Sequence, residues 1–393
     1  MEPVAEPVAE PVAEPVAEPV AEPVTEPVAE PVAEPVAELV AEPIAEPISI
    51  SVQDDAFPLE GGTGVGTNVE AESDVDSEEF LSEYCSGGSS KTTSLAPSVF
   101  SYTYANGRRY HSDRFKSEYF MPNDETEQSR LDLYHHIFGL LLGGKLYTAP
   151  LDHPQRVLDV GTGTGLWAID FAEENPGCEV IGTDLSPIQP AWVPTNVKFE
   201  VDDMEEQWTY PNNHFQYIHI RSLSGSFTDW DRVLKQAYKA LEPGGYVEFQ
   251  DYGCQVFLSD GTLLDRDSDK YPIASYFHHV MGAAERQGKP MVVAPTMKER
   301  MEKVGFVQCK ARIEIWPLGL WPKDKRLKEI GKWGLLGTLE SLYPFGVHIM
   351  TKEGWSPERI KELCDWTAKG MYKNNYYTTG WFVYGRKPEE AVY

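Results

Sequence analysis

Short apolar runs alternate with amphipathic stretches between residues 151 and 255 of this 393-residue chain. The run at 156–160 has the composition of a buried strand, and the apolar spacing at 166–172 is helical. The same reading predicts strands at 179–184, 196–203, 214–221 and 246–250, and a helix at 230–241. Strands that alternate with helices at this spacing predict a parallel sheet with helices on both faces.

The pattern on either side of this region is different. A helix is predicted after residue 121, where Asn123 or Asp124 could cap the N-terminus and acidic residues fall in the first turn. Beyond Asp251, the pattern predicts helices at 271–287, 296–304, 325–342 and 356–373, and strands at 307–316 and 376–385. We expect these two strands to pair antiparallel and complete the sheet, with the helices between them over its ligand-binding edge.

The N-terminal part of the chain has no such periodicity. Residues 1–50 consist largely of a repeated Ala-Glu-Pro-Val unit, in which a proline per turn is incompatible with a helix. Residues 51–95 continue with an acidic composition rich in Gly and Ser. Because neither segment can bury a core, we expect both to be disordered, with order beginning near Val99.

The formal net charge of −28 is concentrated in this tail. Of the 62 acidic residues, 22 lie in residues 1–90, ahead of the first basic residue, Lys91. Residues 91–393 contain the remaining 40 acidic residues and all 34 basic residues. The rest of the chain is therefore only mildly acidic, and no nucleic-acid partner is expected.

Cysteine usage and apolar run lengths indicate the compartment. The five cysteines are scattered without a Cys-x-x-Cys pair, so neither a disulfide framework nor a zinc site is expected. No apolar run is long enough to cross a bilayer, and the N-terminus lacks a signal-peptide pattern. We expect a soluble protein of the cytoplasm or nucleus, with no membrane partner.

A glycine loop connects the first predicted strand to its helix. Its sequence is Asp159-x-Gly161-x-Gly163-x-Gly165, and the helix begins at Leu166. A strand, a glycine turn and a helix in this order present backbone N–H groups to a closely approaching ligand. The dinucleotide pattern requires glycine where Leu166 stands, and a phosphate-binding P-loop requires lysine there.

The loop instead resembles the S-adenosylmethionine loop of class I methyltransferases. The resemblance implies that Asp184, which ends the second strand, accepts both ribose hydroxyls, since a carboxylate can accept two hydrogen bonds. It also implies that Asp203 contacts the adenine amino group and that Met204 packs on the ring. The implied donor-binding residues are Asp159, Gly161, Thr162, Gly163, Gly165, Asp184, Leu185, Asp203, Met204 and Tyr110.

A closer resemblance covers about residues 100–390. Motifs such as Asn106–His111, Thr183–Pro190, Tyr217–His219, Asp229–Trp230 and Pro243–Gly245 are similar to those of the fungal LaeA-like methyltransferases. This family implies a Rossmann-like fold with a seven-stranded, mostly parallel sheet whose last strand is antiparallel. It implies methyl transfer from S-adenosylmethionine to oxygen or nitrogen of a small molecule, or a regulatory role through protein partners.

One departure favours the biosynthetic role. The founding regulator of the family carries a cysteine in the loop, whereas this chain has Gly161-Thr-Gly163. We therefore predict an N-terminal helical cap at 96–150, a donor-binding core at 151–255, and acceptor-side helices with the terminal strands at 256–393. Aromatic residues of the last region could line a pocket for a flat, apolar acceptor, among them Trp316, Trp321, Trp333, Tyr343, Phe345 and Trp355.

The candidate catalytic residues are His219 and Arg221, at the carboxyl end of the fourth strand. His219 could take a proton near neutral pH, or it could be a histidine hydrogen-bonded within the sheet. Tyr110 or Arg109 could close over the donor's carboxylate, or fix the N-terminal segment. No metal is expected, because the acidic stretch 202–206 reads as a solvated turn and 265–276 lacks the residues of a calcium loop.

Overall fold

The computed structural model describes residues 100–112, 114–115, 119–266 and 270–389. The predictions for the repeat and the acidic linker at 1–95 lie outside the described residues. No helix within the described ranges is long and apolar enough to span a membrane.

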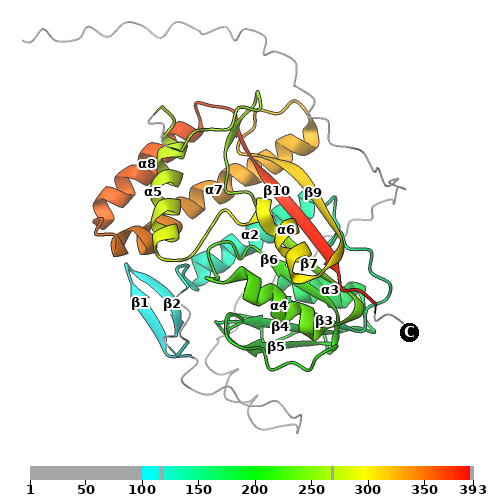
Figure 1. The fold of residues 1–393 in the computed structure, drawn as a ribbon. Helices are drawn as coiled ribbons and strands as arrows, with labels where there is room; N and C mark the ends of the chain where they lie inside the picture. The colour runs from blue at the N-terminus through cyan, green and yellow to red at the C-terminus, as the bar shows by residue number, and fades with distance from the viewer. Residues whose placement is uncertain (1–99, 113, 116–118, 267–269, 390–393) are drawn as a thin grey trace, which may run out of the picture. The chain divides into compact units, whose positions relative to one another are not determined.

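The core of the fold is a sheet with strand order β5-β4-β3-β6-β7-β10-β8, in which β9 pairs with β10 (Figure 1). The parallel strands are β3 (Arg156–Val160), β4 (Glu179–Asp184), β5 (Val197–Val201), β6 (Phe215–Arg221) and β7 (Leu241–Tyr252). The antiparallel strands are β8 (Phe257–Leu258), β9 (Val307–Pro317) and β10 (Tyr376–Arg386). The Rossmann-like sheet and its antiparallel end are therefore confirmed, with the two-residue β8 added to the seven strands expected.

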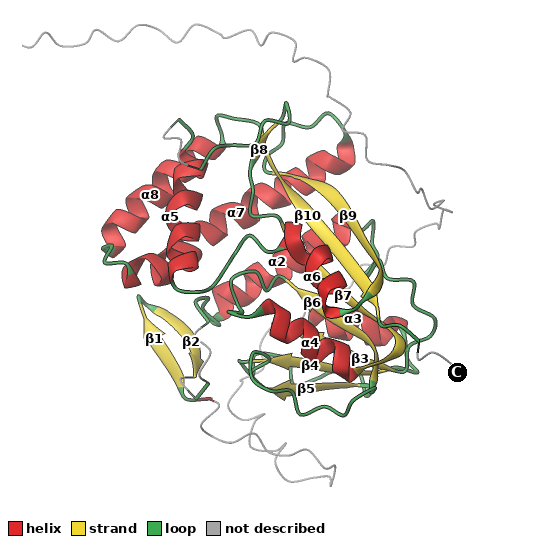
Figure 2. Ribbon diagram, in the orientation of Figure 1, coloured by secondary structure: helices red, strands yellow, loops and turns green. Residues whose placement is uncertain are grey.

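Apolar helix faces cover both sides of this sheet. The helix α3 (Leu166–Glu174) packs on β3 and β6 through a buried cluster that includes Trp167, Phe171 and Tyr217. On the other side, α4 (Trp230–Ala240) and α6 (Met297–Val304) bury their apolar faces, and α6 follows the short 3-10 helix η3 (Ala294–Thr296). Figure 2 shows these helices flanking the strands.

A third core lies among α2 (Glu125–Leu141), α5 (Pro272–Arg286), α7 (Lys325–Lys352) and α8 (Pro357–Met371). The predicted end of α7 at residue 342 is wrong, because the helix continues through Pro344 to Lys352. A proline in a helix costs a hydrogen bond. The buried side chains of Phe345, Val347 and Ile349 in the following turns offset the lost hydrogen bond by packing in the core.

The described chain begins with a hairpin of β1 (Tyr102–Ala105) and β2 (Arg108–Ser112), which the sequence analysis did not predict. Its turn is Asn106-Gly107, with φ of 52° and 72°, and Asn-Gly between two strands is a strong hairpin signal. The hairpin is held to α2 because Arg108 Nη2 donates to Asp124 Oδ1 over 2.7 Å. Asp124, one of the two residues predicted as a possible N-cap, is the N-cap and accepts from the Glu127 N–H.

Candidate active site

A cavity of about 100 Å³ opens at the carboxyl ends of β3, β4 and β6. Ligands of open α/β sheets bind at this edge. Seven of the predicted site residues line the cavity, namely Gly161, Gly163, Asp184, Leu185, Asp203, Met204 and Arg221. Asp159, Thr162, Gly165, Tyr110 and His219 are not among its lining residues.

The glycine loop has left-handed φ angles at Gly161, Gly163 and Gly165, of 67°, 58° and 84°. A Cβ on Gly161 would lie 2.6 Å from Leu223 Cδ2, so a side chain there would clash at the cavity edge. A Cβ on Gly165 would lie 2.4 Å from Phe199 Cζ. Gly161 and Gly163 thus shape the cavity, whereas Gly165 is required by packing behind it.

Asp184 lies at the end of β4 with both carboxylate oxygens fixed. Oδ2 accepts from the Gly163 N–H over 2.9 Å, and Oδ1 accepts from the Ser186 N–H over 3.0 Å. Each oxygen retains a further lone pair for a ligand hydroxyl. Burial raises the pKa of this carboxyl to about 6.

Asp203 and Met204 follow β5 and are both buried. Asp203 Oδ1 accepts from the Glu205 N–H over 3.0 Å, which orients the carboxylate in a tight turn. The Met204 carbonyl accepts from Trp208 Nε1 over 2.9 Å. These bonds hold a carboxylate and an apolar side chain side by side at the cavity, as a purine with an amino group would require.

Asp159 and Thr162 support the loop from behind. Asp159 is buried, and its Oδ2 accepts from Thr162 Oγ1 over 2.6 Å while its Oδ1 lies 2.8 Å from His219 Nδ1. Both carboxylate oxygens are therefore used within the protein. Because neither Asp159 nor Thr162 lines the cavity, their contact with the donor stays a prediction, and the bonds that the structure shows position the loop.

The position of His219 contradicts the catalytic role predicted for it. The side chain is fully buried and stacks on Trp167 with ring centroids 3.7 Å apart and an interplanar angle of 8°. Burial lowers its pKa despite the neighbouring Asp159 carboxylate. The alternative, a histidine hydrogen-bonded within the sheet, describes what the structure contains.

Arg221 reaches the cavity from the end of β6. Its Nη2 lies 2.9 Å from His135 Nδ1, and His135 Nε2 lies 2.9 Å from Asp170 Oδ2. Burial lowers the pKa of the guanidinium to about 10, so it stays positive at neutral pH. Arg221 is thus a fixed cation and not a proton acceptor.

Tyr110 was predicted to contact the donor, but it does not line the cavity. It is buried beside His348, with ring centroids 5.1 Å apart, and a different tyrosine, Tyr119, lines the cavity. Arg109 binds Asn123 Oδ1 over 3.0 Å, as expected for a residue that fixes the N-terminal segment. Asn123 itself lines the cavity and donates to Ser186 Oγ over 3.0 Å.

The sequence analysis missed the contribution of α2. Glu127 and Leu131 line the cavity from this helix. The only sequence signals are the acidic first turn and the apolar stripe of α2, and an ordinary helix has the same features.

No cluster of three or more metal-ligating side chains occurs within the described ranges. Glu205, in the acidic stretch after β5, is instead occupied by the Lys289 ammonium at 3.1 Å and the Thr228 N–H at 2.5 Å. The segment 265–276, which lacks the residues of a calcium loop, includes residues 267–269, which lie outside the described residues.

Comparison with known proteins gives consistent matches. A family profile described as "Methyltransferase domain" matches residues 133–309. The chain is 39% identical over 298 residues to "Methyltransferase pytC" of Aspergillus terreus, covering 75% of this chain and 90% of that protein. It is 34% identical over 243 residues to "Secondary metabolism regulator LAE1" of Cochliobolus heterostrophus, covering 60% and 78% respectively.

Among solved structures, phosphoethanolamine N-methyltransferase 2 of Haemonchus contortus aligns with a TM-score of 0.38 at 23% identity, over 66% of this chain and 52% of that one. The extent of the sequence match to the Aspergillus protein is what establishes the relationship. The chain belongs to the fungal LaeA-like family of class I methyltransferases, which use S-adenosylmethionine as the methyl donor.

Proposed function

We propose that the enzyme methylates oxygen or nitrogen of a small molecule in fungal secondary metabolism. The names of its relatives support the pathway class, since one is called a methyltransferase and another a regulator of secondary metabolism. The single observation that carries donor binding, and with it methyl transfer, is the arrangement of Asp184, which holds its carboxylate between two backbone N–H groups at the edge of the cavity.

In this proposal the cavity lined by Asp184 and Asp203 is the donor cavity. Asp184 accepts the ribose hydroxyls, Asp203 the adenine amino group, and Met204 covers the ring. Gly161 and Gly163 give the donor access to the loop backbone. The sulfonium makes the methyl carbon electrophilic already, so the protein chiefly aligns donor and acceptor and excludes water.

A regulatory function is the second candidate, favoured by the match to LAE1. In that case the methyl acceptor is a protein, or methylation is auxiliary to partner binding. The two candidates differ in where the methyl group goes, which makes them separable by one experiment.

Incubation with methyl-labelled S-adenosylmethionine and an extract of the source organism tests the proposal. Label recovered in a low-molecular-mass metabolite supports biosynthetic methylation. Label recovered only in protein contradicts it and favours the regulator. The Asp184→Ala variant, incubated in the same extract, controls for methyl transfer by other enzymes.

A further inference from the structure

Among the described residues that line the donor cavity, Arg221 carries the only positive charge. The other charged side chains at the cavity are the carboxylates of Glu127, Asp184, Asp202 and Asp203. An anionic group of a ligand in this cavity therefore has one favourable partner among the side chains. S-adenosylmethionine has a single anionic group, the α-carboxylate at its amino-acid end.

The guanidinium of Arg221 is held in place but keeps N–H groups for a ligand. Nη2 donates to His135 Nδ1 over 2.9 Å, and Cζ lies over the Phe138 ring, 5.3 Å from its centroid. Among the described residues, Arg221 forms no other hydrogen bond and no ion pair. A guanidinium has several further N–H donors in a fork that matches a carboxylate, so a two-point contact remains open.

His135 fixes the guanidinium because its second ring nitrogen is also bound. Nε2 lies 2.9 Å from Asp170 Oδ2, and an ionised carboxylate can only accept a hydrogen bond. Nε2 therefore carries the ring proton, and Nδ1 keeps the lone pair that accepts from Arg221. The guanidinium is thus ordered before a ligand arrives, which lowers the entropic cost of binding.

The order of the strands places Arg221 at the amino-acid end of the site. Asp203 follows β5 and Asp184 ends β4, while the glycine loop follows β3 and Arg221 ends β6. These four strands are neighbours in that order. Gly161 and Arg221 each come one residue after the last paired residues of β3 and β6. The donor has the matching order of adenine, ribose, sulfonium and carboxylate, so a donor bound at the two carboxylates extends past the loop towards Arg221.

Two other arginines near the cavity are already paired. Arg109, which the sequence made a candidate for the donor's carboxylate, donates to Asn123 Oδ1 over 3.0 Å and to Glu125 Oε1 over 3.1 Å. Arg130 Nη2 lies 2.6 Å from Glu127 Oε1, and these two residues are 6% and 1% exposed. Neither arginine is among the residues that line the cavity.

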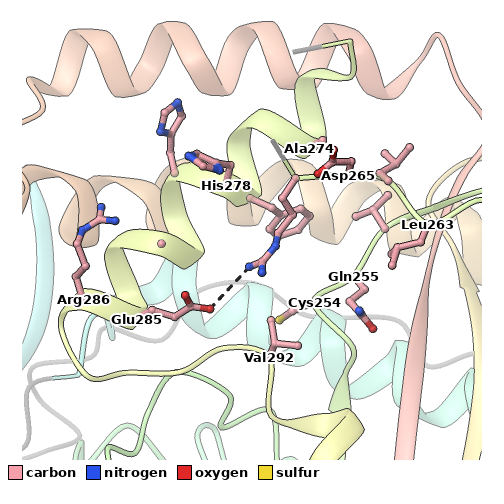
Figure 3. Close-up of a pocket in the computed structure, with 15 residues that line it drawn as sticks. Cys254, Gln255, Leu263, Asp265, Ala274, His278, Glu285, Arg286 and Val292 are labelled. Atoms are coloured by element: carbon pink, nitrogen blue, oxygen red, sulfur yellow. Dashed lines mark ion pairs between the residues drawn. The ribbon is translucent and has the colours of Figure 1, made fainter. Parts of the chain in front are cut away.

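A larger cavity, of about 500 Å³, also contains arginines, and these are paired as well. Figure 3 shows it between α5, which carries Glu285 and Arg286, and the segment that carries Cys254. Arg266 Nη1 lies 3.8 Å from Glu285 Oε1. Arg286 Nε donates to Glu353 Oε2 over 2.8 Å. Both arginines therefore face a carboxylate before any ligand binds, unlike Arg221.

We propose that Arg221 binds the α-carboxylate of the methyl donor and makes the site selective for donors that carry this group. The inference rests on the proposed function, whose donor site it extends. The carboxylate supplies the guanidinium with the anion that the protein does not provide. A donor without a carboxylate instead brings its ammonium group next to an unpaired cation, so selection acts through attraction and repulsion together.

Three ligands separate the parts of the donor: S-adenosylmethionine, its decarboxylated form, and methylthioadenosine, which lacks the whole amino-acid end. Calorimetry on the wild type comes first, and absence of S-adenosylmethionine binding would overturn the proposed function together with this inference. We expect S-adenosylmethionine to bind at least about tenfold more tightly than the decarboxylated form. If the wild type binds both forms equally well, the donor site stands and the inference about Arg221 is wrong.

Arg221→Met removes the charge and should reduce that affinity ratio to below about threefold. Its affinity for methylthioadenosine should stay within about twofold of the wild type, because the adenosine part of the cavity is distant from the change. Arg221→Lys keeps a charge without the fork and should give an intermediate ratio. Arg286→Met, which removes an arginine from the other cavity, should keep the wild-type ratio. An unchanged ratio in Arg221→Met, or an equal loss in Arg286→Met, would contradict the proposal.

Discussion

The Asp159 carboxylate and the His219 imidazole lie 2.8 Å apart on adjacent parallel strands, buried behind the glycine loop. The histidine stacks on Trp167 and the carboxylate also holds Thr162, so the pair joins β3, β6, α3 and the loop into one unit. This contact makes His219 a structural residue.

His219→Gln should therefore affect stability more than chemistry. Loss of the stack and of the buried hydrogen bond should lower the free energy of unfolding by about 1–3 kcal/mol. At a temperature where the variant is folded, kcat should change by less than about threefold. Thermal denaturation and steady-state kinetics on the same preparation measure both, and a lost kcat with an unchanged Tm would restore the catalytic role.

Gly165→Ala should destabilise the fold. The residue has a φ of 84°, and a Cβ would lie 2.4 Å from the Phe199 ring. Strain and overpacking together predict a loss of roughly 2–5 kcal/mol in chemical denaturation. Gly177→Ala is the matched control, because nothing lies within 4 Å of its added Cβ, and its effect should stay below about 1 kcal/mol.

The ion pair of Glu127 and Arg130 should show strong coupling. Arg130→Met leaves a buried carboxylate unpaired and should cost about 3–5 kcal/mol, whereas the double variant with Glu127→Leu should recover most of that loss. A double-mutant cycle by denaturation measures the coupling. Additive effects of the two single changes would show that the pair does not act as a unit.

Donor affinity should rise with pH between 5 and 7.5. Burial raises the pKa of Asp184 to about 6, so the carboxyl is mostly protonated at pH 5 and ionised at pH 7.5. Only the ionised form accepts hydrogen bonds with both oxygens and attracts a sulfonium cation. The linkage predicts about a tenfold gain in affinity over this range, measured by calorimetry. The pH dependence should disappear in Asp184→Asn.

The sheet could be predicted from the sequence because each parallel strand is a continuous apolar run bounded by turn residues. The cavity at the sheet edge was partly predictable for the same reason, since Asp184 is the last residue of one such strand and Asp203 lies two residues after the next. What could not be predicted depends on contacts between distant segments. His219 is buried by Trp167 of another element, and Tyr119 lies at the cavity where Tyr110 was expected.

The same limit applies to the helical region after β7. Helix α7 passes through Pro344 because buried residues of the next turns pack against neighbouring helices, which no local pattern reveals. One cavity, lined by Tyr134, Tyr252 and Trp316 among others, combines side chains from α2, β7, α5, β9, α7 and β10. Individual tryptophans could be nominated from the sequence, but not which of them share a cavity.

The central claim is that Asp184 binds the methyl donor. Calorimetric titration of S-adenosylmethionine into the wild type, Asp184→Ala and the surface control Asp365→Ala tests it directly. Loss of hydrogen bonds to a charged group should weaken binding to Asp184→Ala at least about tenfold, and the control should match the wild type. Equal affinity of Asp184→Ala and the wild type would contradict the assignment of this cavity to the donor.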